Sequence, residues 1–214
     1  MQNIGLIAKQ GYKYVFVLGL LLLLALILGV CQILFFALFV LCIFWFRNPE
    51  RALGSDDTYA VLSPIDGKIK SIDKIYYFDT QCVAITIRKG VFDTGALRAP
   101  CDMELLEAKQ RHGLFLCNAM EASKNLNERA LFICKNLDNK FAIRAIAGPL
   151  SKGISFENFS RLKAGRRFGF LGSGEVVLIL PANVRISVSV GEKVASAGIL
   201  GFFSYEEKDA RQSA

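Results

Sequence analysis

The sequence has little histidine, and it lacks paired cysteines. The only histidine is His112, which excludes the metal sites that use several imidazole ligands. The six cysteines are scattered, and none forms a Cys-x-x-Cys pair. The pattern predicts no metal site and no disulfide framework, and it is typical of a protein in a reducing compartment.

Charge is missing from one long stretch, because no charged residue occurs between Tyr14 and Phe46. A helix of about 33 residues would be roughly 50 Å long, whereas the hydrocarbon core of a bilayer is roughly 30 Å thick. Two structures fit this run. One is a single, strongly tilted helix, and the other is a pair of short helices that fold back at residues 29–32.

The flanks of this stretch are basic on both sides, with Lys9 and Lys13 before it and Arg47 and Arg51 after it. Two cytoplasmic ends, and hence a hairpin, would fit this pattern, although a single span of either orientation stays open. No small-residue cleavage site follows the run, so a signal peptide is not expected. We expect residues 1–47 to form a permanent membrane anchor.

The formal net charge of +7 indicates a partner of negative charge. Nucleic acid and anionic lipid both bind basic surfaces. In a chain with a membrane anchor, anionic lipid is the simpler partner. We therefore expect contact with the membrane and no nucleic acid.

Residues 48–214 contain short apolar runs that glycine, proline, aspartate and asparagine interrupt. Strands are predicted at residues 59–62, 68–72, 82–87, 105–109, 130–135, 141–146, 175–180 and 184–190. Helical periodicity is weak, except around residues 118–127. Many short strands predict a mainly β domain, built as a barrel or a sandwich.

Two loops of this domain share a theme. The Pro-x-Asp-Gly-x-Ile stretch at residues 64–69 and the Val-Gly-x-x-Val stretch at residues 190–194 are similar to those of biotinyl and lipoyl carrier domains. Those domains are barrel-sandwich hybrids, and we expect that fold here. The lysine-bearing hairpin of such a carrier is not visible.

A serine between two glycines stands just before an apolar strand pattern, as Gly172-Ser173-Gly174 before residues 176–180. The backbone can bend tightly there, and the hydroxyl is unhindered. Taken alone, this pattern indicates an ordinary glycine turn. A functional interpretation depends on motifs elsewhere in the chain.

Seven short motifs in the same order make the chain resemble the short bacterial form of phosphatidylserine decarboxylase. They are Phe46-Arg47-Asn48-Pro49-Glu50-Arg51; Ser63-Pro64-Ile65-Asp66-Gly67; Phe92-Asp93 with Arg98-Ala99-Pro100; Gly113-Leu114-Phe115 with Ala119; Asn127-Glu128-Arg129; Ile146-Ala147-Gly148; and Arg167-Phe168-Gly169 with Gly172-Ser173.

The resemblance implies a proenzyme that cuts itself between Gly172 and Ser173 and leaves a pyruvoyl group, made from Ser173, as its cofactor. The two chains would stay together as a heterodimer, and a higher homo-oligomer is left open. A serine hydroxyl needs a proton acceptor nearby. Asp66 is the candidate, since burial would raise the pKa of its carboxyl group.

The resemblance also implies the reaction, which converts phosphatidylserine to phosphatidylethanolamine. The pyruvoyl carbonyl would take up the electrons that remain when carbon dioxide leaves. Arg98 and Arg167 are candidate ligands for the phosphate or carboxylate of the lipid, with an ordinary surface role as the alternative for each. The enzyme would lie at the inner membrane, with its catalytic domain on the cytoplasmic side.

The chain departs from the family pattern at two positions. Gly95 stands where the family has a histidine, and Leu97 stands where it has an asparagine. Glycine cannot move a proton. Two other interpretations therefore stay open: an unprocessed relative that binds lipid or a partner, and a barrel-sandwich adaptor in a membrane assembly.

Overall fold

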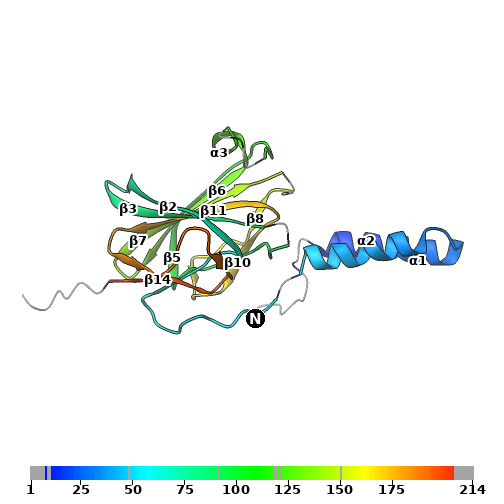
Figure 1. The fold of residues 1–214 in the computed structure, drawn as a ribbon, viewed down its shortest axis with the longest axis horizontal. Coiled ribbons are helices and arrows are strands. Elements are labelled where there is room, and N and C mark those ends of the chain that lie inside the picture. The colour runs from blue at the N-terminus through cyan, green and yellow to red at the C-terminus, as the bar shows by residue number, and fades with distance from the viewer. Residues whose placement is uncertain are drawn as a thin grey trace, which may run out of the picture.

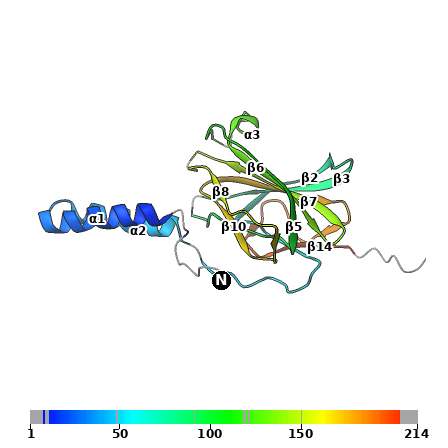
Figure 2. The ribbon, with the colours of Figure 1, turned by 180° about the vertical axis from the view of Figure 1, so that it is seen from behind.

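The computed structural model shows a helical hairpin followed by a β domain (Figure 1). It describes residues 8, 11–47, 49–90, 92–117, 120, 122–149 and 151–204 of the 214. The hairpin projects from the β domain, and both views show its two helices side by side (Figure 2).

The hairpin consists of α1 (Tyr12–Leu28) and α2 (Gln32–Trp45). Between them Gly29 has a φ of 72°, in the left-handed region that glycine adopts at helix ends, and its N–H donates to the carbonyl of Ala25. The bend predicted at residues 29–32 is confirmed. The alternative of one long tilted helix is wrong.

Neither helix is long. α1 has 17 residues and α2 has 14, or about 25 Å and 21 Å. Within the part of the chain that the structure describes, no helix combines the length and the apolar character needed to cross a membrane. The side chains of the hairpin are nevertheless apolar and widely exposed, with Ile33 86% and Ile27 74% accessible.

The β domain contains three antiparallel sheets. The largest has the order β13-β2-β3-β11-β7-β6-β5-β9, and the two smaller sheets have the orders β1-β14-β12 and β4-β10-β8. The strands are β1 (Ala60–Leu62), β2 (Gly67–Tyr77), β3 (Thr80–Arg88), β4 (Ala96–Arg98), β5 (Met103–Arg111), β6 (Arg129–Asn136), β7 (Asn139–Ala147), β8 (Ile154–Phe156), β9 (Arg161–Leu162), β10 (Arg167–Leu171), β11 (Gly174–Pro181), β12 (Val184–Ile186), β13 (Lys193–Val194) and β14 (Ile199–Phe203).

The mainly β architecture confirms the prediction, and all eight predicted strands are present. The last is shorter than expected, because β12 ends at Ile186. The sequence missed β4, β8, β9, β10, β13 and β14, which are too short to show an alternating pattern. Around residues 118–127 the described helix is only α3 (Ser123–Leu126), and residues 118, 119 and 121 lie outside the described residues.

Strand β11 lies in the middle of the large sheet, between β3 and β7. Its Val176, Leu178 and Leu180 belong to the main core, whereas Ile179 belongs to a second, smaller cluster on the other face. Both faces of β11 are therefore covered, which explains its continuous apolar sequence. The strand holds the residues that follow Ser173 firmly in place.

Candidate active site

The predicted cleavage point lies in the two-residue connection between β10 and β11. Gly172 is buried and Ser173 is half-buried. Gly174 has a φ of 140°, and a Cβ atom there would overlap the carbonyl oxygen of Ile146. Only glycine fits after the serine, because close packing fixes this position.

Backbone hydrogen bonds from three separate segments hold this connection. They run from Leu171 N–H to the Gly95 carbonyl (2.8 Å), from Gly148 N–H to the Ser173 carbonyl (2.8 Å) and from Lys89 N–H to the Gly174 carbonyl (3.1 Å). The serine is therefore held on a defined support, as a reacting group requires.

Gly95 is packed against the strand that leads to the cleavage point. A Cβ atom on it would lie 2.5 Å from the Leu171 carbonyl oxygen and 2.8 Å from atoms of the Phe170 ring. No side chain fits at position 95 unless the backbone moves. The chain therefore lacks both the family histidine and the space for it.

Asp66 is buried, with 5% of its surface exposed, and its carboxylate accepts three hydrogen bonds. The donors are Arg51 Nη2 at 2.8 Å, Thr94 Oγ1 at 2.9 Å and the Ser196 N–H at 2.6 Å. Burial acts to raise the pKa of Asp66, but the hydrogen bonds and the charge of Arg51 outweigh it, and the pKa is lowered. The expected burial is present, whereas the expected rise in pKa is not.

Arg98 and Arg167 both donate to the carbonyl of Pro49, over 2.9 Å and 3.1 Å. Arg98 also donates to the Gly165 carbonyl, and burial lowers its pKa to about 10. These contacts fix the segment that joins the hairpin to the β domain. A role for either arginine in substrate binding stays a prediction.

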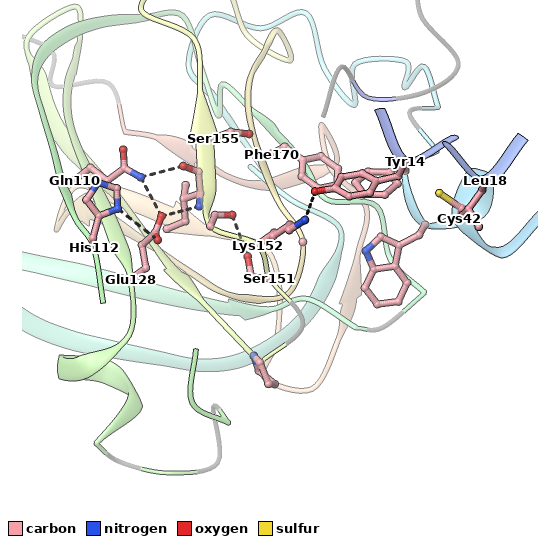
Figure 3. A pocket seen from close by; sticks show the side chains of 16 residues that line it. Tyr14, Leu18, Cys42, Gln110, His112, Glu128, Ser151, Lys152, Ser155 and Phe170 are labelled. Atoms are coloured by element: carbon pink, nitrogen blue, oxygen red, sulfur yellow. Dashed lines mark hydrogen bonds and ion pairs between the residues drawn. The ribbon is translucent and has the colours of Figure 1, made fainter. Parts of the chain in front are cut away.

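A cavity of about 830 Å³ lies where the hairpin meets the β domain (Figure 3). The hairpin contributes Tyr14, Leu18, Cys42, Trp45 and Phe46, and the β domain contributes Phe170, Gly172, Gln110, His112, Glu128, Pro149, Ser151, Lys152, Gly153, Ile154 and Ser155. The glycine of the predicted cut is thus part of the cavity wall.

One end of the cavity is polar. The buried carboxylate of Glu128 accepts hydrogen bonds from Gln110 Nε2 at 3.0 Å and from the Ile154 N–H at 2.9 Å. Nδ1 of His112 lies 3.6 Å from the same carboxylate. The single histidine of the chain therefore lines the same cavity as Gly172, although it does not occupy the family position.

The other end of the cavity is aromatic. The ring of Phe46 stacks on Tyr14, with centroids 5.5 Å apart, and on Phe170, with centroids 5.8 Å apart. Lys152 lies between the polar and aromatic ends, where its Nζ contacts the hydroxyl of Tyr14 and lies 4.4 Å from the centre of that ring (Figure 3). The cavity suits an amphipathic ligand that carries a negative charge.

Comparison with known proteins gives the same family as the motifs. The family model for phosphatidylserine decarboxylase matches residues 38–201. The chain belongs to this family. The matched range contains the connection at residues 172–173, Asp66 and Gly95, and most of the hairpin precedes it.

Curated relatives match over most of their length. The phosphatidylserine decarboxylase proenzyme of Syntrophotalea carbinolica is 29% identical over 206 residues, which cover 92% of this chain and 96% of that protein. The proenzyme of Burkholderia multivorans is 30% identical over 207 residues, which cover 91% of this chain and 95% of that protein. No solved structure matches the chain significantly.

Sequence reasoning missed two lysines near the family's cleavage motif. Lys89 has a detectable signal, because it extends the inward positions of Ile85 and Ile87 by one step. Lys152 has no such signal, since it stands in a loop and reaches the cavity only through the fold. The contribution of the hairpin to the cavity was missed for the same reason.

Proposed function

We propose that this chain is a proenzyme that cuts its backbone between Gly172 and Ser173 and then converts phosphatidylserine to phosphatidylethanolamine. Family membership supports the reaction. The observation that carries the proposal is the place of Gly172, at the predicted cut, in the wall of an amphipathic cavity of about 830 Å³. Self-cleavage of the backbone and binding of the lipid substrate would then take place at one site.

Maturation needs only groups of the chain and water. Oγ of Ser173 attacks the carbonyl carbon of Gly172, so that a C–O bond forms while the peptide C–N bond breaks, and the hydroxyl proton moves to the nitrogen of Ser173. Loss of the Cα proton of residue 173 then breaks its Cβ–Oγ bond and releases the carboxylate of Gly172. Water removes the nitrogen as ammonia and leaves the pyruvoyl group.

The residues around the cut fit such a group. The carbonyl of Ser173 is held by Gly148, and the first residues of β11 are held by β3 and β7, so the new end of the chain would stay at the cavity wall. A bound pyruvoyl group supplies a carbonyl that accepts electrons from the bond to the departing carbon dioxide.

The two ends of the cavity match the two ends of a phospholipid. We assign the phosphodiester of the substrate to Lys152, the cationic side chain between the polar and the aromatic ends. The apolar side chains of Leu18, Trp45 and Phe46 would accompany the start of the acyl chains. The polar group around Glu128 would face the serine headgroup.

The hairpin would bring this cavity to the membrane surface. Its exposed apolar side chains and its length of about 21 to 25 Å suit a re-entrant insertion from one side of the bilayer. The basic residues Arg47 and Arg51 at its end suit the cytoplasmic face of the inner membrane.

The cleaved chains would remain one heterodimer. Residues 173–214 contribute β11 to the middle of the large sheet and β12 and β14 to a small sheet. We also assign the β domain to the barrel-sandwich-hybrid type. The two loops that resemble carrier domains meet, since the Ile69 N–H donates to the Glu192 carbonyl over 2.9 Å and β13 pairs with β2.

A second function is lipid binding without chemistry. One observation favours it, because the packing around Gly95 leaves no space for the family histidine. The test is the conversion of phosphatidylserine in mixed vesicles by the purified full chain, with Ser173→Ala beside it and Ser71→Ala as the control. We expect product from the wild type and the control and none from Ser173→Ala. Vesicle binding by all three without any product would favour the second function.

A further inference from the structure

Self-cleavage requires a group that takes the proton of the Ser173 hydroxyl, because a neutral hydroxyl is a weak nucleophile. Gly95 offers none. Asp66 already accepts three hydrogen bonds and has a lowered pKa, both of which make it a poor proton acceptor. The structure therefore has to supply this group from elsewhere.

We propose that the side-chain amine of Lys89 is the proton acceptor for Ser173 during self-cleavage. The inference rests on the proposed function above and names the group that replaces the histidine missing at position 95.

The strand register places Lys89 beside the cleavage point. Arg88, the last residue of β3, pairs with Glu175 of β11. One residue further on, the N–H of Lys89 donates to the carbonyl of Gly174 over 3.1 Å. The backbones of Lys89 and Gly174 are thus one strand spacing apart, about 4.8 Å.

Strand alternation directs the side chain of Lys89 inward. Ile85 and Ile87 belong to the main core, while Arg88 is turned to the other face, where its Nε lies 2.8 Å from Oε1 of Glu175. Position 89 follows the same alternation as the two isoleucines. Lys89 is accordingly buried, with 8% of its surface exposed.

The amine of Lys89 has no carboxylate at ion-pair distance among the residues that the structure describes. Its Nζ donates to the neighbouring Gly90 carbonyl at 3.0 Å and lies 5.8 Å from the centre of the Trp45 ring. The nearby Asp93 is occupied by the Gly90 N–H at 2.7 Å. A buried amine without an ion-pair partner readily exists in its neutral, proton-accepting form.

Burial has a larger effect on the pKa of Lys89 than the charges around it. Burial lowers the pKa of Lys89 most, Asp93 and Asp66 raise it, and Arg47 lowers it further, so that the pKa is about 8. In about a tenth of the molecules the amine of Lys89 is then neutral at pH 7. Asp66 and Asp93 are also placed to stabilise the ammonium ion that forms when the proton arrives.

His112 is the rival proton acceptor, and the sheet keeps it away. Between Ser173 and His112 lie β7 and β6, because Gly174 pairs with Ala147 and the Ala147 N–H donates to the Glu128 carbonyl. Three strand spacings of about 4.8 Å separate the two backbones by roughly 14 Å. That distance exceeds the hydrogen-bond reach that proton transfer requires.

The proton balance of the step is closed. Neutral Lys89 takes the proton of the Ser173 hydroxyl as the new C–O bond to Gly172 forms. It returns the proton to the nitrogen of Ser173 as the C–N bond breaks, and so ends neutral again. No oxidant, reductant or co-reactant takes part.

The experiment follows cleavage of the freshly purified full chain by denaturing mass measurement between pH 6 and 9. For the wild type we expect a rate that rises about tenfold per pH unit below pH 8 and levels off above it. Lys89→Met and Lys89→Arg should slow cleavage at least about 100-fold. Lys70→Met, which removes a cation bound to Glu175 on the other face, is the matched control and should cleave at the wild-type rate.

Chemical rescue distinguishes two roles of Lys89, that of a proton acceptor and that of a residue needed only for the fold. Added methylamine should restore cleavage in Lys89→Ala, with a pH dependence that follows the added amine. Cleavage of Lys89→Met at the wild-type rate would overturn the inference, as would a block by His112→Gln alone. If the Lys89 variants do not fold, a flat wild-type profile from pH 6 to 9 overturns it. A wild type that never cleaves overturns the proposed function first.

Discussion

The carbonyl oxygen of Ser173 accepts a 2.8 Å hydrogen bond from the backbone N–H of Gly148. This bond joins Ser173, the first residue after the predicted cut, to the loop that follows β7. β10 lies on the other side of the cut, so the bond does not depend on the covalent link between Gly172 and Ser173. The new end of the chain would therefore keep its position when its covalent link to Gly172 is lost.

Replacing Asp66 by asparagine should slow self-cleavage at pH 9 roughly tenfold or more, because the ammonium ion that would form on Lys89 loses a stabilising negative charge and Arg51 loses its partner. The rate is measured from the two product masses, and Asp73→Asn, at an exposed position of β2, is the control. Unchanged cleavage in Asp66→Asn would remove this residue from the maturation site.

The same carboxylate should give stability a pH dependence. The pKa of Asp66 is lowered in the folded chain, so its contribution is present above the unfolded pKa of about 3.9 and is lost as pH falls through the folded value. Urea unfolding should show a wild-type advantage over Asp66→Asn of about 1–3 kcal/mol at pH 7 that shrinks toward pH 3. An advantage that is constant over this range would contradict the linkage.

A side chain introduced at Gly95 should lower the stability of the folded chain. Gly95→Ala places a Cβ atom 2.5 Å from the Leu171 carbonyl oxygen, and the overpacking should cost about 1–3 kcal/mol of stability. Gly95→His should be worse and should not speed maturation. Thermal unfolding and cleavage rates measure both effects. Faster cleavage in a stable Gly95→His chain would show that the site still accommodates the family residue.

Removing the charge of Lys152 should weaken substrate binding without stopping chemistry. We expect Lys152→Met to raise KM for phosphatidylserine in vesicles roughly tenfold while kcat changes less than about twofold. Lys152→Arg should recover most of the affinity, and Lys140→Met, at an exposed position of β7, is the matched control. A fall in kcat with unchanged KM would place Lys152 outside the phosphate site.

Apolar contact of the hairpin with lipid can be tested at its exposed end. Ile33→Glu puts a charge on a side chain that is 86% exposed and should reduce vesicle binding roughly tenfold or more. Tyr76→Glu makes the same kind of change at an exposed position of β2. Equal flotation of both variants with vesicles would exclude insertion of this end of the hairpin.

The sequence was sufficient for the long elements and for the bend between the helices. A continuous apolar run identified β11, and Gly29 marked the turn of the hairpin. It was not sufficient for β10, whose five residues are too few for a pattern and whose position is set by pairing with β4 and β8. The β10 register is what brings Phe170 against Gly95.

The candidate site was partly visible for a similar reason. Ser173 and Asp66 stand in local motifs, and a local motif is what sequence reasoning detects. The pKa of Asp66 depends on Arg51, Thr94 and Ser196, which only the fold assembles. Arg98 was a candidate substrate ligand on its charge and motif, and that role stays a prediction; its bonds to the Pro49 and Gly165 carbonyls could not be predicted, because only the fold brings these segments together.

The most direct test of the account is the mass of the purified full chain under denaturing conditions. The account predicts two pieces, residues 1–172 and residues 173–214, the second with a blocked first residue, and a single piece for Ser173→Ala. One intact wild-type chain of 23.7 kDa, stable for days at pH 8 to 9, would contradict it.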